Sequence, residues 1–193
     1  MKTQFDFFAN IVALQLIIIA LGITKILEGF SWIVTTNVCD TYWVHTLGST
    51  LIVLLLLQYA WTSLHDYTVR RWTFGDFLLQ CATPMLYLFV AGLLFPNDLN
   101  QCDLKEVYRR NIRVIAALVM VAQVVNSVLD LRYHPGGSLR AHKHIIRCGT
   151  IVVLAGLMTR LPQFQWLHEL LVAVLFGALL LFCLRYTPAL ETG

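Results

Sequence analysis

Long apolar runs recur along this chain at short intervals, and they constrain its fold more than any other feature. A run of about 20 apolar residues can cross the hydrocarbon core of a bilayer as a helix, and the sequence offers about six such runs in succession. The composition agrees, because 58% of the 193 residues are hydrophobic and 13% are charged, roughly half the charged share of a typical soluble domain. We therefore expect an all-α fold, a polytopic membrane helix bundle.

The predicted spans leave no room for a separate soluble domain of ordinary size. We expect residues 1–193 to form one transmembrane domain of about six helices. A 3+3 inverted repeat is an option, because three crossings reverse the orientation of the second half. The charge spacing of residues 103–113 favours a helical extension in front of the fourth span. The spans are predicted at about 7–34, 42–64, 74–95, 111–131, 144–161 and 166–184.

The distribution of lysine and arginine predicts the orientation of the bundle. With the N-terminus in the cytoplasm, eight basic residues fall on the cytoplasmic side and five on the outer side. Basic residues accumulate in cytoplasmic loops, so both termini are expected to be cytoplasmic. The same count places Cys39 and Cys102 together on the outer side, where they either form a disulfide or remain as two thiols.

Tyrosine and tryptophan residues gather near the ends of the predicted spans. Such residues form belts at membrane interfaces, where their amphipathic rings lie at the level of the headgroups. The predicted belt residues are Tyr42, Trp43, Trp61, Tyr67, Trp72, Tyr108, Tyr133, Trp166 and Tyr186.

Polar residues inside the predicted spans follow lines along helix faces. Gln80 and Tyr87 share one line on the third span, and Gln123 and Asn126 share one on the fourth. Polar groups are costly in lipid, so these lines should face each other or a wet cavity. They indicate either a hydrated path or hydrogen bonds that hold the helices together. Pro84, in the third span, frees a backbone carbonyl that a neighbour or water must satisfy.

Lys25 and Glu28 are charged residues within the first predicted span. At positions i and i+3 they can form an ion pair, which lowers the cost of placing each charge in a membrane. His45, near the start of the second span, is expected within reach of Glu28. We predict a buried cluster that serves either as an outer vestibule for ions or protons or as a lock between helices. The face that carries Lys25 also includes Gln15, Gly22 and Gly29.

No catalytic or metal site is predicted. The sequence holds no P-loop, nucleophile elbow or zinc-protease helix, so an enzyme is not favoured. No cofactor is expected either, although haem is an alternative because histidines occur near both faces of the predicted bundle. A net charge of +3 without a polybasic cluster gives no case for nucleic acid. The histidines considered for haem are His45, His65, His142, His144 and His168.

Three short segments of the chain carry a resemblance to a known class of protein. The run from Leu21 to Gly29, followed by Tyr42-Trp43-Val44-His45 and by Gln58-Tyr59-Ala60-Trp61, resembles small uncharacterised multi-pass proteins of the bacterial inner membrane. The likeness covers about the first third of the chain. It implies a bacterial protein with several spans and carries no particular activity.

Together these patterns predict a small channel or transporter in the bacterial inner membrane. The expected cargo is an ion, a proton or a small solute, and a homo-oligomer is expected because six short spans enclose little volume. The path is assigned to the polar and charged residues described above. The alternatives are a membrane-embedded sensor or accessory subunit that binds a protein partner, and a membrane redox or lipid-modifying enzyme. The path residues are Lys25, Glu28, His45, Gln80, Tyr87, Gln123 and Asn126.

Overall fold

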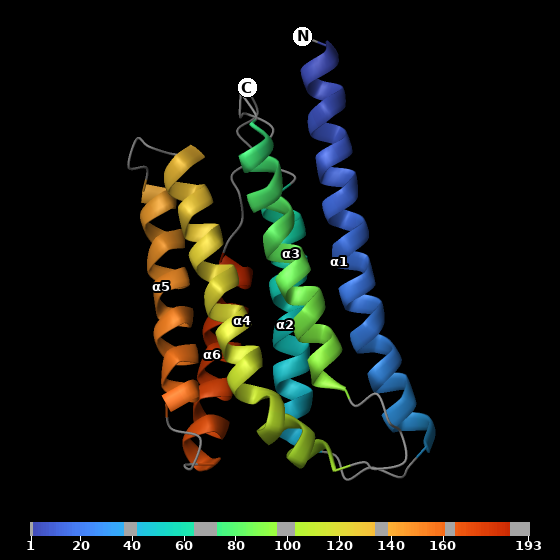
Figure 1. Ribbon diagram of the computed structural model, residues 1–193. Helices are drawn as coiled ribbons and strands as arrows, with labels where there is room; N and C mark the ends of the chain where they lie inside the picture. The colour runs from blue at the N-terminus through green and yellow to red at the C-terminus, as the bar shows by residue number, and fades with distance from the viewer. Residues whose placement is uncertain are drawn as a thin grey trace.

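The computed structural model is all-helical in the part of the chain that it describes, with six α-helices and no strand (Figure 1). The described residues are 2–36, 42–63, 73–95, 103–133, 139–160 and 165–185. The helices are α1 (Lys2–Thr36), α2 (Trp43–Ser63), α3 (Phe74–Leu94), α4 (Leu104–Tyr133), α5 (Leu139–Arg160) and α6 (Gln165–Arg185). These bounds lie close to the predicted spans, and the expected extension before the fourth span is present, since α4 begins at Leu104.

Four of these helices are long and apolar enough to cross a membrane. The qualifying stretches are Ala9–Thr35, Trp43–Ser63, Phe74–Leu94 and Leu104–Leu129. Within their described residues, α5 and α6 carry shorter apolar stretches, Cys148–Leu157 and Glu169–Leu181. The expectation of a helical membrane protein is therefore met by α1 to α4.

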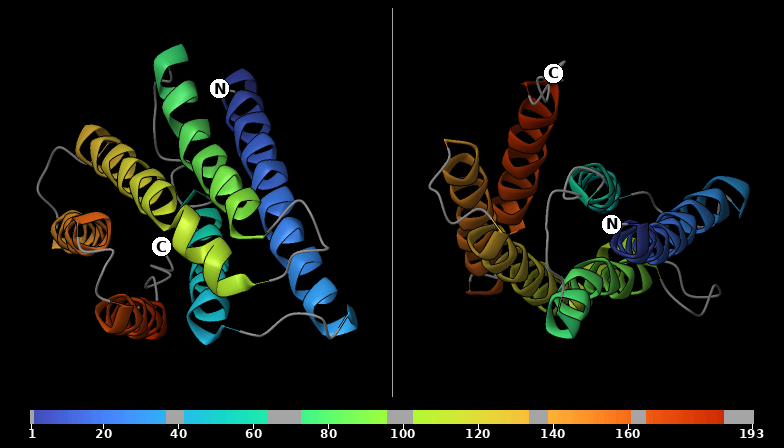
Figure 2. Two further views of the ribbon diagram at one scale, coloured as in Figure 1. Left: turned by 60° about the horizontal axis from the view of Figure 1, so that its bottom comes forward. Right: turned by 90° about the horizontal axis from the view of Figure 1, so that it is seen from above.

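Helix α3 lies at the centre of one half of the bundle. It contacts α1, α2 and α4, while α4 packs along α5 and α2 packs along α6 (Figures 1 and 2). In the left view of Figure 2, α5 and α6 are both seen nearly end-on, whereas α1, α3 and α4 are seen lengthwise. The two halves pack differently, because α1 lies along α3 whereas α4 lies along α5. This arrangement gives the predicted inverted repeat no support.

Two glycines let α1 approach its neighbours closely. A Cβ on Gly22 would lie 3.1 Å from Leu56 Cδ1 of α2 and 3.8 Å from the Cα of Leu88 in α3. A Cβ on Gly29 would overlap the ring of Phe95, just past the end of α3. Small residues at helix contacts are a common feature of membrane proteins, because they let backbones pack together without a cavity.

The first turn of α3 is fixed by a capping box. The Thr73 side chain accepts a hydrogen bond from the backbone N–H of Asp76, and an Asp76 carboxylate oxygen accepts from the Thr73 backbone N–H at 2.9 Å. The other oxygen of this buried carboxylate lies 3.0 Å from Nε of Arg132, which is half exposed near the end of α4. Asp76 thus satisfies the helix start and ties α3 to α4.

Helices α1 and α4 extend past the last turn of α3. The contacts of Gly22 with Leu88 and of Gly29 with Phe95 set α1 parallel to α3, so α1 continues about two turns beyond it. Helix α4 is antiparallel to α3, and because Asn111 bonds to the Leu93 carbonyl, about the first seven residues of α4 project past the same end, a length of about 10 Å.

Three of the residues predicted for the aromatic belt are exposed near helix ends. Trp43, Trp61 and Trp166 lie near helix ends with about half or more of each side chain exposed. Tyr108 is different, because only 5% of its side chain is exposed and it packs edge-on against Tyr42. Its assignment to the belt was wrong, since the start of α4 is amphipathic and Tyr108 lies on the buried side together with Leu104.

Candidate functional site

The polar line predicted on α3 is buried and bonded to three neighbouring helices. On the α1 side, the amide nitrogen of Gln15 donates to the amide oxygen of Gln80 at 3.2 Å. Both side chains are buried. This hydrogen bond joins α1 to α3 at about the middle of the bundle.

Tyr59 of α2 supplies the donor that Pro84 makes necessary. Proline has no N–H, so Pro84 leaves the backbone carbonyl of Gln80, four residues earlier, without its helical partner. The Tyr59 hydroxyl lies 2.6 Å from this carbonyl oxygen and 2.7 Å from the amide oxygen of the same residue. A phenol has one proton, so it donates to one of the two oxygens at a time. The helix continues unbroken through Pro84 from Phe74 to Leu94.

Two side-chain hydrogen bonds tie α3 to α4. The Thr83 hydroxyl donates to the amide oxygen of Asn126 at 2.9 Å, and the amide nitrogen of Gln123 donates to the Tyr87 hydroxyl at 2.5 Å. Thr83, Tyr87 and Gln123 are each no more than 1% exposed. The structure thus brings together the four path residues predicted on α3 and α4, and it pairs them with polar partners on neighbouring helices.

The last turn of α3 is capped by side chains of two other helices. The final carbonyls of a helix lack partners within it, and lipid supplies none. Nε2 of His45 lies 2.6 Å from the carbonyl oxygen of Leu94, and the amide nitrogen of Asn111 donates to that of Leu93 at 2.8 Å. His45 therefore carries its proton on Nε2 and acts as a cap for α3.

Lys25 and Glu28 do not form the buried cluster that we expected. Both side chains are exposed on α1, and the described part of the chain shows no ion pair between them and no contact of either with His45. The face of α1 that packs against α2 and α3 contains Ile26, which is fully buried. The prediction of a buried, coupled pair was wrong, because Lys25 lies at the edge of that face and Glu28 beyond it.

Five buried polar atoms have no hydrogen-bond partner in the described structure, and one of them, Oδ1 of Asp76, lies within ion-pair distance of Arg132. Nδ1 of His45 and Oγ of Ser49 lie one helical turn apart on α2, and the Tyr108 hydroxyl and the amide oxygen of Gln123 belong to α4. Buried polar atoms of this kind usually hold an ordered water molecule. Because these atoms come from separate levels of the bundle, they do not by themselves define a binding site.

An apolar pocket of about 60 Å³ lies between α2, α4, α5 and α6. Ile52, Ile112, Ile151 and Val172 contribute to its wall, one from each of these helices. The atoms that face the pocket are apolar, so it has no means of holding water or an ion. None of the predicted path residues lines it.

The described side chains can be compared with the predictions on metal and haem. No group of three or more His, Cys, Asp or Glu residues that could hold a metal ion occurs among them. The side chains of His65, His142, His144 and His168 lie outside the described residues, as do both members of the predicted pair Cys39 and Cys102.

Sequence reasoning missed Tyr59 and Asn111, which satisfy backbone carbonyls of α3. Pro84 indicated that a donor such as Tyr59 was needed, because a proline in a membrane helix leaves a backbone carbonyl that a neighbouring helix must satisfy. No nearby sequence pattern indicated the role of Asn111, since this residue and the end of α3 come together only in the folded bundle.

No protein-family model, no curated protein and no solved structure matches this chain. The bacterial membrane-protein family suggested by the first third of the sequence therefore stays a prediction. The contacts described above are the basis for any functional assignment.

Proposed function

We propose that this chain is a membrane-embedded accessory or sensor subunit with a closed interior. One observation carries the proposal: Gln80, Tyr87, Gln123 and Asn126 each share a hydrogen bond with a side chain of another helix. Contacts of this kind hold membrane helices together with about 0.6–2 kcal/mol each. A subunit of this kind acts through its outer faces and its helix ends.

The proposed subunit crosses a bacterial inner membrane six times and has both termini in the cytoplasm. The lengths of α5 and α6, 22 and 21 residues, support this, because such helices reach about 30 Å. The start of α1 and the end of α6 also point towards the same end of the bundle (Figure 1).

We further propose that the subunit forms homo-oligomers. The exposed Lys25 and Glu28 support this, because the opposite charges of one copy can pair with those of another. These two residues then belong to an interface instead of a vestibule.

Flux measurements in liposomes test the closed interior. We expect vesicles that contain the protein to leak protons no faster than protein-free vesicles, because paired polar side chains leave no continuous wet path. A pH-sensitive dye trapped inside the vesicles measures the proton rate, and a potassium gradient with valinomycin sets the driving force. A protein-dependent rate several-fold above background would contradict the proposal.

A channel or transporter is the second candidate function, for an ion, a proton or a small solute. The unpartnered buried atoms of His45, Ser49 and Gln123 favour it, because the water molecules they require could form part of a path. If flux is found, Gln123→Leu should abolish it while the variant still elutes as a folded particle. Equal flux in this variant and the parent protein would argue against a path at Gln123.

A further inference from the structure

The outward face of α4 carries an apolar stripe that ends in two arginines. The stripe consists of Val114, Val121, Val124, Val128 and Leu131, each about half exposed and spaced at seven, three, four and three residues. Residues at this spacing share one face of a helix. Because α3 and α5 cover other sides of α4, this face is left uncovered by the bundle, and we expect lipid acyl chains to lie against it.

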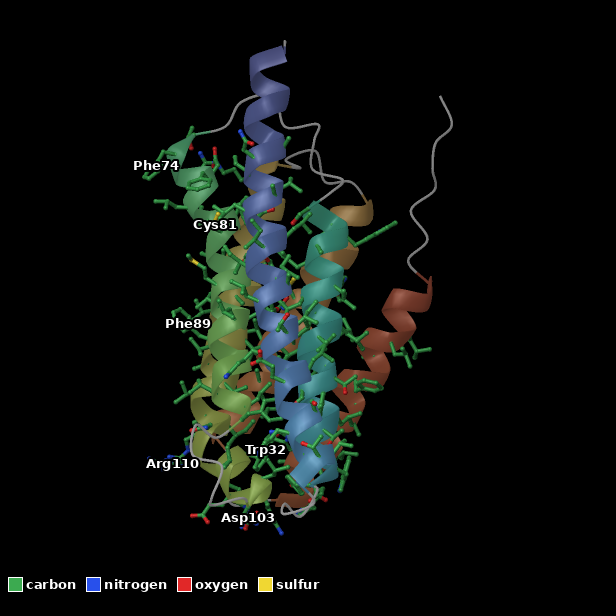
Figure 3. All side chains as sticks on the ribbon, turned by 90° about the vertical axis from the view of Figure 1, so that its right-hand side faces the viewer. Trp32, Phe74, Cys81, Phe89, Asp103 and Arg110 are labelled. Carbon is green, nitrogen blue, oxygen red and sulfur yellow. The ribbon has the colours of Figure 1, made fainter. Side chains whose placement is uncertain are left out.

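Arg110 and Arg113 continue this stripe at its end nearest the start of α4. Arg110 lies one turn before Val114 on the same line, and Arg113 lies at the edge of the line, aligned with Leu131. Both side chains are exposed, and neither has a hydrogen bond or ion pair in the described part of the chain. Figure 3 shows Arg110 directed away from the bundle.

The register between α3 and α4 places these arginines at the membrane boundary. Asn111 donates to the backbone carbonyl of Leu93, so the last turn of α3 is level with about residue 111 of α4. Arg110 and Arg113, on either side of Asn111 in the sequence, therefore lie at about the level where α3 ends. The exposed Trp43 marks the same end of the bundle, as expected for a headgroup region.

We propose that Arg110 and Arg113 bind the phosphate of an anionic phospholipid whose acyl chains lie along the apolar stripe. Two guanidinium groups one turn apart can each donate paired hydrogen bonds to phosphate oxygens. They favour a lipid with net negative charge, because in a zwitterionic lipid the ammonium group already compensates the phosphate. Glu106 lies one turn farther out along the same line, so the arginines stand between it and the lipid.

Binding of phosphatidylglycerol and phosphatidylcholine to the purified full-length protein tests this site, with native mass spectrometry as the readout. In the double variant Arg110→Gln/Arg113→Gln, we expect phosphatidylglycerol to bind about 25-fold more weakly, about fivefold for each arginine. Binding of phosphatidylcholine should change little. The matched control is Lys105→Gln/Arg109→Gln, which removes the same charge from the same segment at positions outside the apolar stripe. Its affinity for phosphatidylglycerol should fall by no more than about twofold.

Three outcomes would overturn the proposed lipid site. An equal loss in the control variant would show that phosphatidylglycerol responds to overall charge, and an unchanged affinity in the double variant would exclude the two arginines. Glycerol phosphate, which has no acyl chains, serves as a further arm and should not displace the lipid at millimolar concentration. Displacement would identify the arginines as a site for free phosphate and would contradict a lipid site.

Discussion

Replacing Tyr59 with phenylalanine is expected to destabilise the folded protein by about 1–3 kcal/mol. The substitution removes the hydroxyl that lies 2.6 Å from the Gln80 carbonyl, and Pro84 cannot replace it as a donor. Tyr59 and Gln80 are both buried, so we expect bulk water to compensate poorly for the lost donor. The free energy of unfolding, measured by titration from mild detergent into SDS mixed micelles, should fall by this amount.

A double-mutant cycle with Pro84→Ala tests whether the loss of stability in Tyr59→Phe comes from the unsatisfied Gln80 carbonyl. An alanine at position 84 restores an N–H, which can bond to the Gln80 carbonyl within the helix. The cost of Tyr59→Phe should then shrink by about 1 kcal/mol or more, because the carbonyl no longer depends on the phenol. Tyr42→Phe is the matched control, since its half-buried hydroxyl donates to Glu169 at the bundle end, where water can take its place. Equal costs of Tyr59→Phe in both backgrounds would refute this role of Tyr59.

Replacing Gly29 with alanine is expected to destabilise the protein by about 1–3 kcal/mol, despite the better helix propensity of alanine. The new Cβ would overlap the ring of Phe95. That ring cannot move aside easily, because it packs edge-on against Phe30 at 5.6 Å and against His45 at 5.0 Å between ring centroids. The same detergent titration measures the loss.

Gly92→Ala is the control for this clash. A Cβ at Gly92 would meet no atom within 4 Å, so the variant should be as stable as the parent or slightly more so. Replacing the ring with a smaller side chain in Phe95→Leu should leave space for the methyl group of alanine. The loss in free energy of unfolding caused by Gly29→Ala should then be much smaller. A loss from Gly29→Ala that persists in the Phe95→Leu background would show that another contact is responsible.

The helices of this bundle could be predicted from sequence because their signal is local. Apolar runs of membrane-spanning length define α2 and α3 to within one residue at each end, whereas α1 begins five residues before the predicted span. The charge spacing of 103–113 correctly predicted the early start of α4. The inward lines of α3 and α4 followed from helical periodicity, since Gln80, Tyr87 and Gln123 are all buried. The hydrogen-bond partners of these residues could not be predicted, because a polar line along a helix indicates only that a polar neighbour or water is needed.

The burial of Lys25 was mispredicted for a reason that lies in helix geometry. A residue three positions after Gly22 lies about 60° away around the helix, while a residue four positions after it lies about 40° away on the other side. Ile26, at the second position, is fully buried against the bundle, and Lys25 falls at the exposed edge. Spacing alone made both positions members of one face, and only packing decided which was inside.

His45 shows the limit of reasoning from neighbours along the chain. Its nearest charged candidates in sequence suggested an ionic cluster, but it bonds to the end of α3, almost 50 residues away. This bond satisfies a carbonyl in the last turn of α3, which has no partner within the helix. Whether His45 can reach that carbonyl depends on where α3 ends relative to α2. That relation is tertiary and has no local sequence pattern.

Reactivity of a cysteine at position 83 with a hydrophilic, membrane-impermeant thiol reagent tests the closed interior most directly. Thr83 is fully buried between Gln80 and Tyr87, and cysteine nearly matches threonine in size. In a background without the native cysteines, we expect Thr83→Cys to remain unlabelled while Thr35→Cys, at the exposed end of α1, is labelled readily. Labelling of Thr83→Cys at a rate close to that of Thr35→Cys would show that water reaches the polar core and would contradict the account.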